Sequence, residues 1–412
     1  MHSALLIATL AITHVTVIDV ASGTLRRDAI VVVRGDRIES SGSAVPKDAQ
    51  IVDGHGKFLI PGLWDMHVHL SWTKESALML LVANGVTGVR DLGGKLSELD
   101  EWRTKIAAGL IIGPRIFRAG PILNGQKFNQ FQMVPGNADE TRGVVRALKE
   151  VGVDFIKVHR RMLRDSYFAA IDEAKKQGLP LVGHIPMTVT PEEASDAGQA
   201  TIEHVATLFE GTFSAALNGR KLPDAMREWR AEKADALFAR FVKNHTIVDP
   251  TLFAYRPDAD APDPRSRFVA LSFRKIAASQ PKPSAEEIEE SKVVYAEFKE
   301  VVRQMNRDGV TLLAGTDIAA ARIPGFTLHD ELAALVECGL TPLQALQAAT
   351  ITPRRVLNQP DDLADLVLLD ADPLKDIRNT QRIVAVIARG RLFRRGDLDA
   401  LLGRVEKKAA QE

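Results

Sequence analysis

The chain has 412 residues, 45% of them hydrophobic, and its 53 Lys and Arg residues are balanced by 53 Asp and Glu residues. This length allows one large domain and a smaller one, because single hydrophobic cores stop growing at about 250–300 residues. The zero formal net charge excludes the broad basic surface that nucleic-acid binding needs. The single cysteine, Cys338, excludes a disulfide within the chain, and we interpret it as a small packing residue.

The first apolar run, residues 4–12, is shorter than the roughly 20 residues that a membrane-spanning helix needs. It could be the core of a trimmed signal peptide, although no Lys or Arg precedes it, or a first β-strand. The compartment therefore stays open between the cytoplasm and, if a signal peptide has been removed, the periplasm or the exterior.

Both ends of the chain show the alternation typical of short β-strands. Near the start, residues 12–19 and 29–34 alternate, and glycine-containing turns separate the strands. Near the end, residues 364–370 and 383–388 have strand character, and Gly390 follows in a turn. We predict a small β-sandwich domain made from residues 1–57 and 359–412.

Between these ends, apolar strand-like segments alternate with segments of helical periodicity, which include residues 139–151, 165–177 and 223–244. This alternation predicts an α/β fold, a TIM-like (β/α)8 barrel over residues 58–358. The eight parallel strands are expected at residues 58–69, 85–91, 114–118, 154–159, 179–184, 200–204, 246–251 and 310–317.

Residues 258–308 form a longer connection than a strand and a helix normally need. They include a proline-containing stretch and a charged helical pattern at residues 284–308. We interpret the segment as an insertion near the barrel mouth, either a lid or an outer helix that faces solvent.

Polar residues interrupt the apolar strands mainly at their carboxyl ends, where barrel enzymes place catalytic groups. His67 and His69, two residues apart on the first strand, face the same side and could hold one metal ion. The other strand-end candidates are Lys157 and His159 on strand four, His184 on strand five, His204 on strand six and Asp317 on strand eight.

Each candidate alone has an ordinary structural explanation. A histidine at a strand end is often only hydrogen-bonded, Asp317 after Gly-Thr could cap a helix, and Lys157 could belong to a buried ion pair. Their joint occurrence at five strand ends favours a metal-dependent active site.

These residues, in this order, resemble the amidohydrolase superfamily, and in particular its members with two metals bridged by a carboxylated lysine. Within the superfamily, the chain is similar to the branch related to imidazolonepropionase and Xaa-Pro dipeptidases. The resemblance covers nearly the whole chain. Its main segments are residues 60–69, 85–91, 154–157, 202–204, 314–317, 339–350 and 364–373.

The resemblance implies two metal ions per chain. Zinc is expected, because His-rich sites with a few oxygen ligands suit Zn²⁺, although other divalent ions are compatible. The implied ligands are His67, His69 and Asp317 for one metal, His184 and His204 for the other, and Lys157, carboxylated by carbon dioxide, as the bridge between them.

The implied reaction is hydrolysis of a carbon-nitrogen amide bond, in a dipeptide or an N-acyl amino acid, by a hydroxide shared between the metals. Asp317 is the expected group that moves a proton from this water to the leaving amine. His159 and Tyr255 are candidate catalytic contacts to the substrate carbonyl or carboxylate. The arginines after strand four either bind a substrate carboxylate or form a solvated face; they are Arg160, Arg161 and Arg164.

Three other functions compete with this one. An esterase, lactonase or phosphotriesterase could use the same two-metal site, because an activated hydroxide does not select the leaving atom. A mononuclear deaminase on the same fold usually lacks the strand-four lysine, so Lys157 argues against it. A non-enzymatic relative would have lost ligands that this chain keeps. We expect a small-molecule substrate, no nucleic-acid or membrane partner, and assembly into a homo-oligomer.

Overall fold

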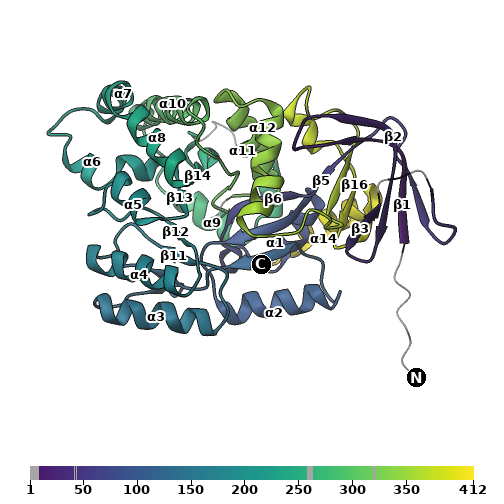
Figure 1. Cartoon of the computed structure of the whole chain (residues 1–412), viewed down its shortest axis with the longest axis horizontal. Coiled ribbons are helices and arrows are strands. Elements are labelled where there is room, and N and C mark those ends of the chain that lie inside the picture. The colour runs from purple at the N-terminus through teal and green to yellow at the C-terminus, as the bar shows by residue number, and fades with distance from the viewer. Residues whose placement is uncertain (1–8, 41, 43, 258–262, 319–321) are drawn as a thin grey trace.

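The structure is a computed structural model that describes residues 9–40, 42, 44–257, 263–318 and 322–412. A sheet built from both chain ends lies beside a larger part in which helices surround short parallel strands (Figure 1). Of the apolar run at residues 4–12, positions 4–8 lie outside the described residues, and the remainder begins a strand. None of the described helices is long and apolar enough to cross a membrane.

Both chain ends contribute strands to one eight-stranded sheet. The central strand β1 (Thr9–Ile18) pairs antiparallel with β2 (Leu25–Arg34) and parallel with β5 (Phe58–Pro61). From the other end of the chain, β15 (Leu366–Leu369) pairs antiparallel with β5. The remaining strands of this sheet are β3 (Arg37–Ser40), β4 (Gln50–Asp53), β16 (Ile383–Ala388) and β17 (Arg391–Arg394).

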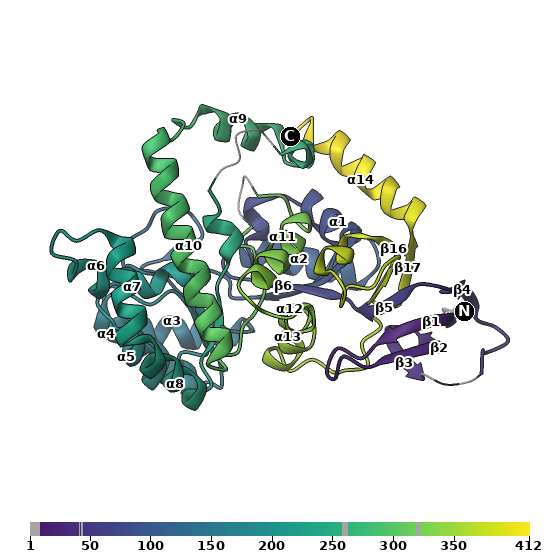
Figure 2. The ribbon, with the colours of Figure 1, turned by 90° about the horizontal axis from the view of Figure 1, so that it is seen from above.

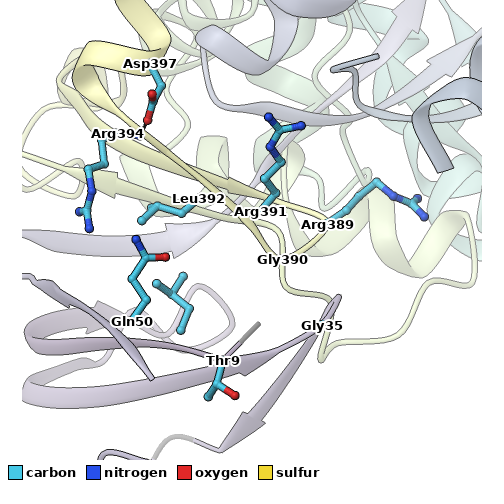
Figure 3. A pocket seen from close by; sticks show the side chains of 10 residues that line it. Thr9, Gly35, Gln50, Arg389, Gly390, Arg391, Leu392, Arg394 and Asp397 are labelled. Atoms are coloured by element: carbon cyan, nitrogen blue, oxygen red, sulfur yellow. Dashed lines mark hydrogen bonds between the residues drawn. The ribbon is translucent and has the colours of Figure 1, made fainter. Parts of the chain in front are cut away.

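A cavity of about 400 Å³ lies in the terminal part, lined by residues of β1, β4 and β17 and of the start of helix α14 (Figure 3). Its three arginine side chains, Arg389, Arg391 and Arg394, point away from one another. None of the strand-end candidates lines this cavity.

The strand expected over residues 58–69 is two strands separated by Gly62, so the prediction of one continuous strand is wrong. β5 belongs to the terminal sheet, whereas β6 (Leu63–Val68) begins the parallel strands. A Cβ atom at position 62 would lie 2.1 Å from the Thr87 hydroxyl oxygen, so the close approach of the two segments requires glycine.

The parallel strands form a three-stranded and a six-stranded sheet. Most of them are shorter than the sequence predicts, and β9 and β10 were not predicted at all. In chain order after β6 they are β7 (Val86–Asp91), β8 (Arg115–Arg118), β9 (Ile122–Leu123), β10 (Gln132–Met133), β11 (Ile156–Val158), β12 (Leu181–Gly183), β13 (Thr201–Glu203) and β14 (Ile247–Asp249).

Backbone hydrogen bonds join the two parallel sheets on both sides. On one side, the Asp154 N–H donates to the Arg118 carbonyl at 3.0 Å. On the other side, the segment 311–318 bridges β14 and β6, with isolated parallel bridges at Leu312 and Ile318. The eighth strand expected at residues 310–317 is thus an extended segment that pairs only at single positions.

Helices cover the outside of the parallel strands (Figure 1). The predicted helices at residues 139–151 and 165–177 are α3 (Ala138–Glu150) and α4 (Arg164–Lys176). The single helix expected at residues 223–244 is two helices, α7 (Leu222–Glu232) and α8 (Ala234–Asn244), and α14 (Arg395–Ala409) was not predicted.

The other described α-helices are α1 (Ser76–Ala83), α2 (Leu96–Ala107), α5 (Pro191–Ala197), α6 (Thr212–Ala215), α9 (Leu271–Ser279), α10 (Ala285–Arg307), α11 (Phe326–Glu337), α12 (Pro342–Ala348) and α13 (Ile351–Val356). Short 3-10 turns complete the described elements, at η1 (Leu70–Trp72), η2 (Val205–Phe209), η3 (Leu252–Tyr255), η4 (Pro264–Phe268) and η5 (Ile377–Gln381).

The insertion at residues 258–308 forms η4, α9 and α10 in its described part, and positions 258–262 lie outside the described residues. A capping box between Ser284 and Glu287 begins α10, which runs beside α7 and α8 (Figure 2). α10 buries Phe298, Val301 and Val302, so it is an outer helix with one face in the core rather than a fully solvated one.

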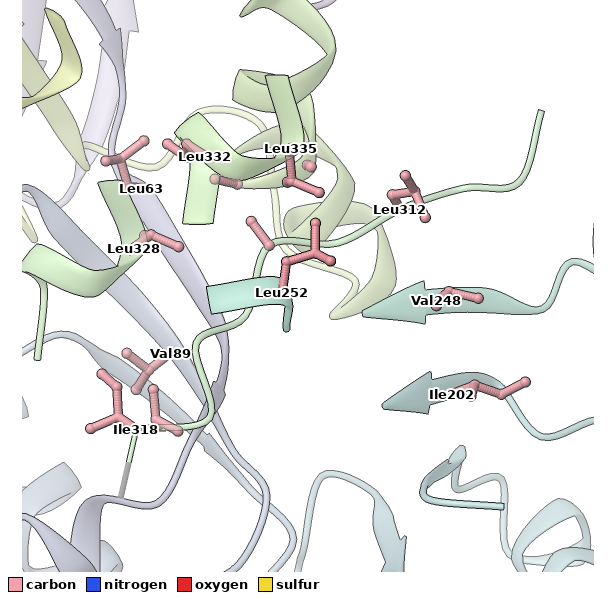
Figure 4. Close-up of a cluster of buried hydrophobic side chains, with 14 of the residues drawn as sticks. Leu63, Val89, Ile202, Val248, Leu252, Leu312, Ile318, Leu328, Leu332 and Leu335 are labelled. Carbon is pink, nitrogen blue, oxygen red and sulfur yellow. The ribbon is translucent and has the colours of Figure 1, made fainter. Parts of the chain in front are cut away.

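The main hydrophobic core lies between the parallel strands and helix α11 (Figure 4). Leu63, Ile202 and Val248 from the strands and Leu328 and Leu332 from α11 are all fully buried. Burying one such side chain contributes about 1.5–3 kcal/mol. This packing holds the carboxyl ends of the strands at fixed positions, and these ends carry the candidate site.

Candidate metal centre

The first group of candidate ligands meets at the end of β6. Asp317 Oδ1 lies 3.5 Å from Nε2 of His67 and 3.5 Å from Nε2 of His69. His67, His204 and Asp317 each offer one ligand atom, and these three atoms lie within 4.8 Å of one another. These distances suit three ligands around a single ion.

The second group lies beside the first. The His184 ring centroid is 4.6 Å from that of His204 and 4.3 Å from that of His159, and the Tyr255 ring meets His204 edge-on at 6.2 Å. Lys157 is buried on β11, which pairs with β12, the strand that leads to His184. Burial first, and the Lys157 charge as a smaller cause, lower the pKa of His67, His184 and His204. The structure therefore brings the four candidate histidine ligands, Asp317, His159 and Tyr255 into one cluster.

Hydrogen bonds outside the cluster orient two of the imidazole rings. His69 Nδ1 lies 3.0 Å from the Gly93 carbonyl oxygen, and His204 Nδ1 lies 2.8 Å from the Thr251 hydroxyl. With Nδ1 occupied in this way, Nε2 of each ring is left to bind a cation, which is the usual arrangement of metal-binding histidines. The sequence patterns did not reveal Thr251.

The backbone is strained where the site forms. His204, Thr251 and Asp317 have φ values of 70°, 46° and 50°, in the left-handed region that non-glycine residues rarely adopt. Such conformations require about 1–3 kcal/mol each and persist only where the surrounding structure enforces them.

Burial sets the protonation of the site. Burial first, and the Lys157 charge second, lower the pKa of His159 to about 3, and burial lowers the pKa of His204 to about 4. These imidazoles are therefore neutral at pH 7, as metal binding requires. Burial also lowers the pKa of Lys157 to about 8, which raises the fraction of neutral amine that can react with carbon dioxide.

The donor set fits a divalent cation. Both ring nitrogens of His67, Nδ1 of His184 and Nζ of Lys157 are buried and have no hydrogen-bond partner in the described part of the chain. A buried polar atom without a partner is unfavourable by about 1–3 kcal/mol. A cation would give one ring nitrogen of His67 a partner, while its Nδ1 lies 3.5 Å from Glu203 Oε2.

A buried ionic network beneath the site was missed by the sequence analysis. Arg90 Nη2 donates to both carboxylate oxygens of Glu203 at 2.9 Å, and it lies 3.6 Å from Asp249. Burial, and then the charge of Glu203, raise the pKa of the Asp249 carboxyl well above its usual value. The only sequence signal was polar residues within otherwise apolar strands.

Replacing Arg90 by methionine is expected to lower the free energy of unfolding by about 3–5 kcal/mol, because Glu203 would be left as a buried charge without its partner. Urea unfolding of the purified proteins measures the change. Arg34→Met is the control, because Arg34 pairs with Glu39 at 3.1 Å on the surface and should contribute no more than about 1 kcal/mol. Equal losses in the two variants would show that the buried network adds no special stability.

The arginines after β11 have other partners. Arg164 donates to Glu193 and to the Thr188 carbonyl, and Arg160 lies 3.4 Å from Glu210. The Arg161 guanidinium stacks over the Phe128 ring at 5.0 Å. Cys338 is fully buried, in agreement with a packing role.

Comparison with known proteins supports the resemblance. The model of the amidohydrolase family matches residues 58–393. An uncharacterised protein of Mycobacterium bovis is 28% identical over 364 residues, which cover 82% of this chain and 86% of that protein. Bottromycin amidohydrolase superposes with a TM-score of 0.81 at 24% identity, over 97% of this chain and 90% of that chain. A Bifidobacterium longum protein assigned as a prolidase superposes with a TM-score of 0.70 at 26% identity, over 97% and 99% of the two chains.

The superfamily predicted from the strand-end residues is thereby confirmed. The family match spans most of the chain, and family members of this kind are hydrolases with a TIM-barrel-type α/β fold that generally bind divalent metals. The chain belongs to the amidohydrolase family.

Proposed function

We propose that this protein hydrolyses the amide bond of dipeptides or N-acyl amino acids with the help of two divalent metal ions, Zn²⁺ in the simplest case. The observation that carries the proposal is the buried amine of Lys157, which has no hydrogen-bond partner in the described structure and lies among neutral imidazoles. The likeness to a protein assigned as a prolidase supports an amide beside a free carboxylate as the substrate.

In this proposal each residue has a separate task. His67, His69 and Asp317 hold one ion, His184 and His204 hold the other, and Lys157, as its carbamate, contacts both. Two bound cations would supply a nucleophilic hydroxide at neutral pH and polarise the substrate carbonyl.

The proton steps fall to Asp317. Burial alone would raise the pKa of its carboxyl, but the imidazoles of His69 and His67 outweigh this and hold the pKa well below its usual value. Asp317 is thus a carboxylate at neutral pH. It takes a proton from the attacking water and passes it to the leaving amine nitrogen.

His159 and Tyr255 orient the substrate. His159 is neutral and lies beside His184, so one ring nitrogen can donate a hydrogen bond to the carbonyl or carboxylate oxygen. Burial raises the pKa of Tyr255, which keeps its hydroxyl protonated and able to donate. The His159 ring contacts that of His184, and the Tyr255 ring contacts that of His204.

We also propose that the chain from β6 to α13, residues 63–356, forms a (β/α)8 barrel and that the strands of both chain ends form a small β-sandwich domain. The boundary expected at residue 58 moves to Gly62, because β5 belongs to the terminal sheet. The backbone bonds that link the parallel sheets through segment 311–318 support the first part, and the pairing of β15 with β5 supports the second. A small-molecule substrate, a homo-oligomeric state, and the absence of nucleic-acid or membrane partners remain proposals from the sequence.

The zinc-loaded protein should be tested against a panel of dipeptides and N-acyl amino acids, each matched with the corresponding ester, and against lactones and phosphotriesters. We expect turnover of the amides above that of a parallel Asp317→Asn preparation, which controls for contaminating hydrolases. Turnover confined to esters, lactones or phosphotriesters would show that the protein is an esterase, lactonase or phosphotriesterase rather than an amidase. No turnover above the control, with full metal content, would contradict an enzymatic role.

A further inference from the structure

The turn after β14 carries two residues of the site. Thr251 begins it in the left-handed conformation and holds His204 Nδ1 through its hydroxyl, and Tyr255 ends it with its ring edge toward His204. The turn itself, η3, is a single 3-10 turn of four residues, too short to hold its own shape. Something outside the turn must therefore keep Thr251 in place.

Helix α11 supplies that support through a buried carboxylate. Glu331 is fully buried, and each of its carboxylate oxygens accepts one backbone hydrogen bond, from Leu252 N–H at 2.9 Å and from Phe253 N–H at 2.6 Å. These N–H groups at the start of the 3-10 turn have no acceptor within the turn. Burial raises the pKa of Glu331 to about 8, and the two backbone hydrogen bonds act in the opposite direction. The Leu252 side chain packs against leucines of the same helix (Figure 4).

A second contact holds the other end of the turn. Arg322 Nη2 donates to the Ala254 carbonyl at 3.0 Å, while its Nη1 donates to the Asp317 carbonyl at 2.7 Å. The turn is thus held at its N–H groups by Glu331 and at a carbonyl by Arg322. Among the described hydrogen bonds, those of the Glu331 side chain go to Leu252 and Phe253 and none goes to a candidate metal ligand.

We propose that Glu331 is a positioning residue, which fixes the Thr251 turn and through the Thr251 hydroxyl sets the orientation of the His204 imidazole. This inference rests on the proposed metal centre. It describes two successive contacts, from Glu331 on α11 to the turn and from Thr251 of the turn to His204. Glutamine at position 331 can accept only one of the two N–H bonds and presents an amide NH₂ to the other, so Glu331→Gln is the direct test.

The experiment uses the full-length protein loaded with Co²⁺. In wild type, isothermal titration should show two cobalt ions, and the visible absorption of Co²⁺ reports on imidazole coordination. In Glu331→Gln we expect the weaker-bound ion to lose about tenfold in affinity, with a changed cobalt spectrum, because outer-layer partners of metal ligands typically contribute 10–100-fold. Glu337→Gln is the matched control, since Glu337 lies on the same helix, is largely exposed and contacts only Lys299 at 3.7 Å among the described ion pairs.

Thr251 variants test the path. Thr251→Val keeps the branched side chain and removes the hydroxyl, so it should reproduce the cobalt spectrum of Glu331→Gln, whereas Thr251→Ser should restore the wild-type spectrum. If the effect passes through Thr251, the double variant Thr251→Val/Glu331→Gln should lose no more affinity than the larger single loss.

The outcomes separate this inference from the proposed function. If wild type binds no cobalt, the metal centre itself is wrong. If wild type binds two ions and Glu331→Gln has an unchanged spectrum and affinity, with only a lower melting temperature, Glu331 is purely structural and the inference is overturned.

Discussion

Lys157→Ala is expected to abolish metal binding and turnover together. Lys157 is buried on β11, which pairs with the strand that leads to His184, and its carbamate is the only proposed ligand shared by both ions. Without it, four neutral imidazoles and one carboxylate remain as ligands for two divalent cations, and only the carboxylate offsets their charge. We expect less than one tightly bound metal per chain by elemental analysis and a fall in kcat of more than about 10³-fold, beyond the usual effect of one electrostatic group.

Added short carboxylic acids should restore part of the activity of Lys157→Ala, because a carboxylate can occupy the space of the carbamate. Lys149→Ala, on the exposed side of α3, is the control and should keep its metal and its activity. Full activity in Lys157→Ala would remove the two-metal scheme.

Asp317→Asn is expected to separate metal binding from catalysis. The amide still offers an oxygen near Nε2 of His67 and His69, so at least one ion should stay bound. It cannot take up the proton of the attacking water, and losing an acid-base group typically lowers kcat by about 10²–10⁴-fold. Metal analysis and kcat with a saturating substrate measure the two effects.

Asp376→Asn, at a half-buried position that begins η5, is the control for this substitution and should leave kcat unchanged. If Asp317→Asn keeps normal turnover, a different group moves the proton, and His159 becomes the next candidate.

The grouping of the candidate ligands could be predicted because strand periodicity and parallel strand order bring the ends of distant strands together. A strand has a period of two residues, so His67 and His69 had to share a face, and parallel strands had to bring His184 and His204 to the same end. The ligand types at these strand ends are rare in buried strands, which made them conspicuous without any knowledge of the fold.

The supporting residues could not be predicted, because their partners are far away along the chain. Arg90 and its partner Glu203 are 113 residues apart in the sequence, and Glu331 accepts from Leu252, which lies 79 residues before it. No periodicity encodes such pairs. A charged residue inside an apolar segment signals only that some partner must exist.

Some predicted element boundaries are wrong, for physical reasons that lie outside the strand or helix itself. Gly62 looks like an ordinary bend in sequence, but its contact with Thr87 divides one apolar run between two sheets. Residues 310–317 have strand composition, yet among the described bridges they pair only at Leu312, and the next bridge falls at Ile318 just after them. In both cases, tertiary packing decides what the local pattern leaves open.

The place of β15 between β5 and β16 has a practical consequence for anyone who shortens this protein. A truncation after α13 would remove β15 and leave β5 with an open row of backbone donors and acceptors. Exposed edges of this kind recruit other chains and lead to aggregation. The catalytic portion therefore should not be expressed without its C-terminal tail, even though that tail contributes none of the proposed ligands.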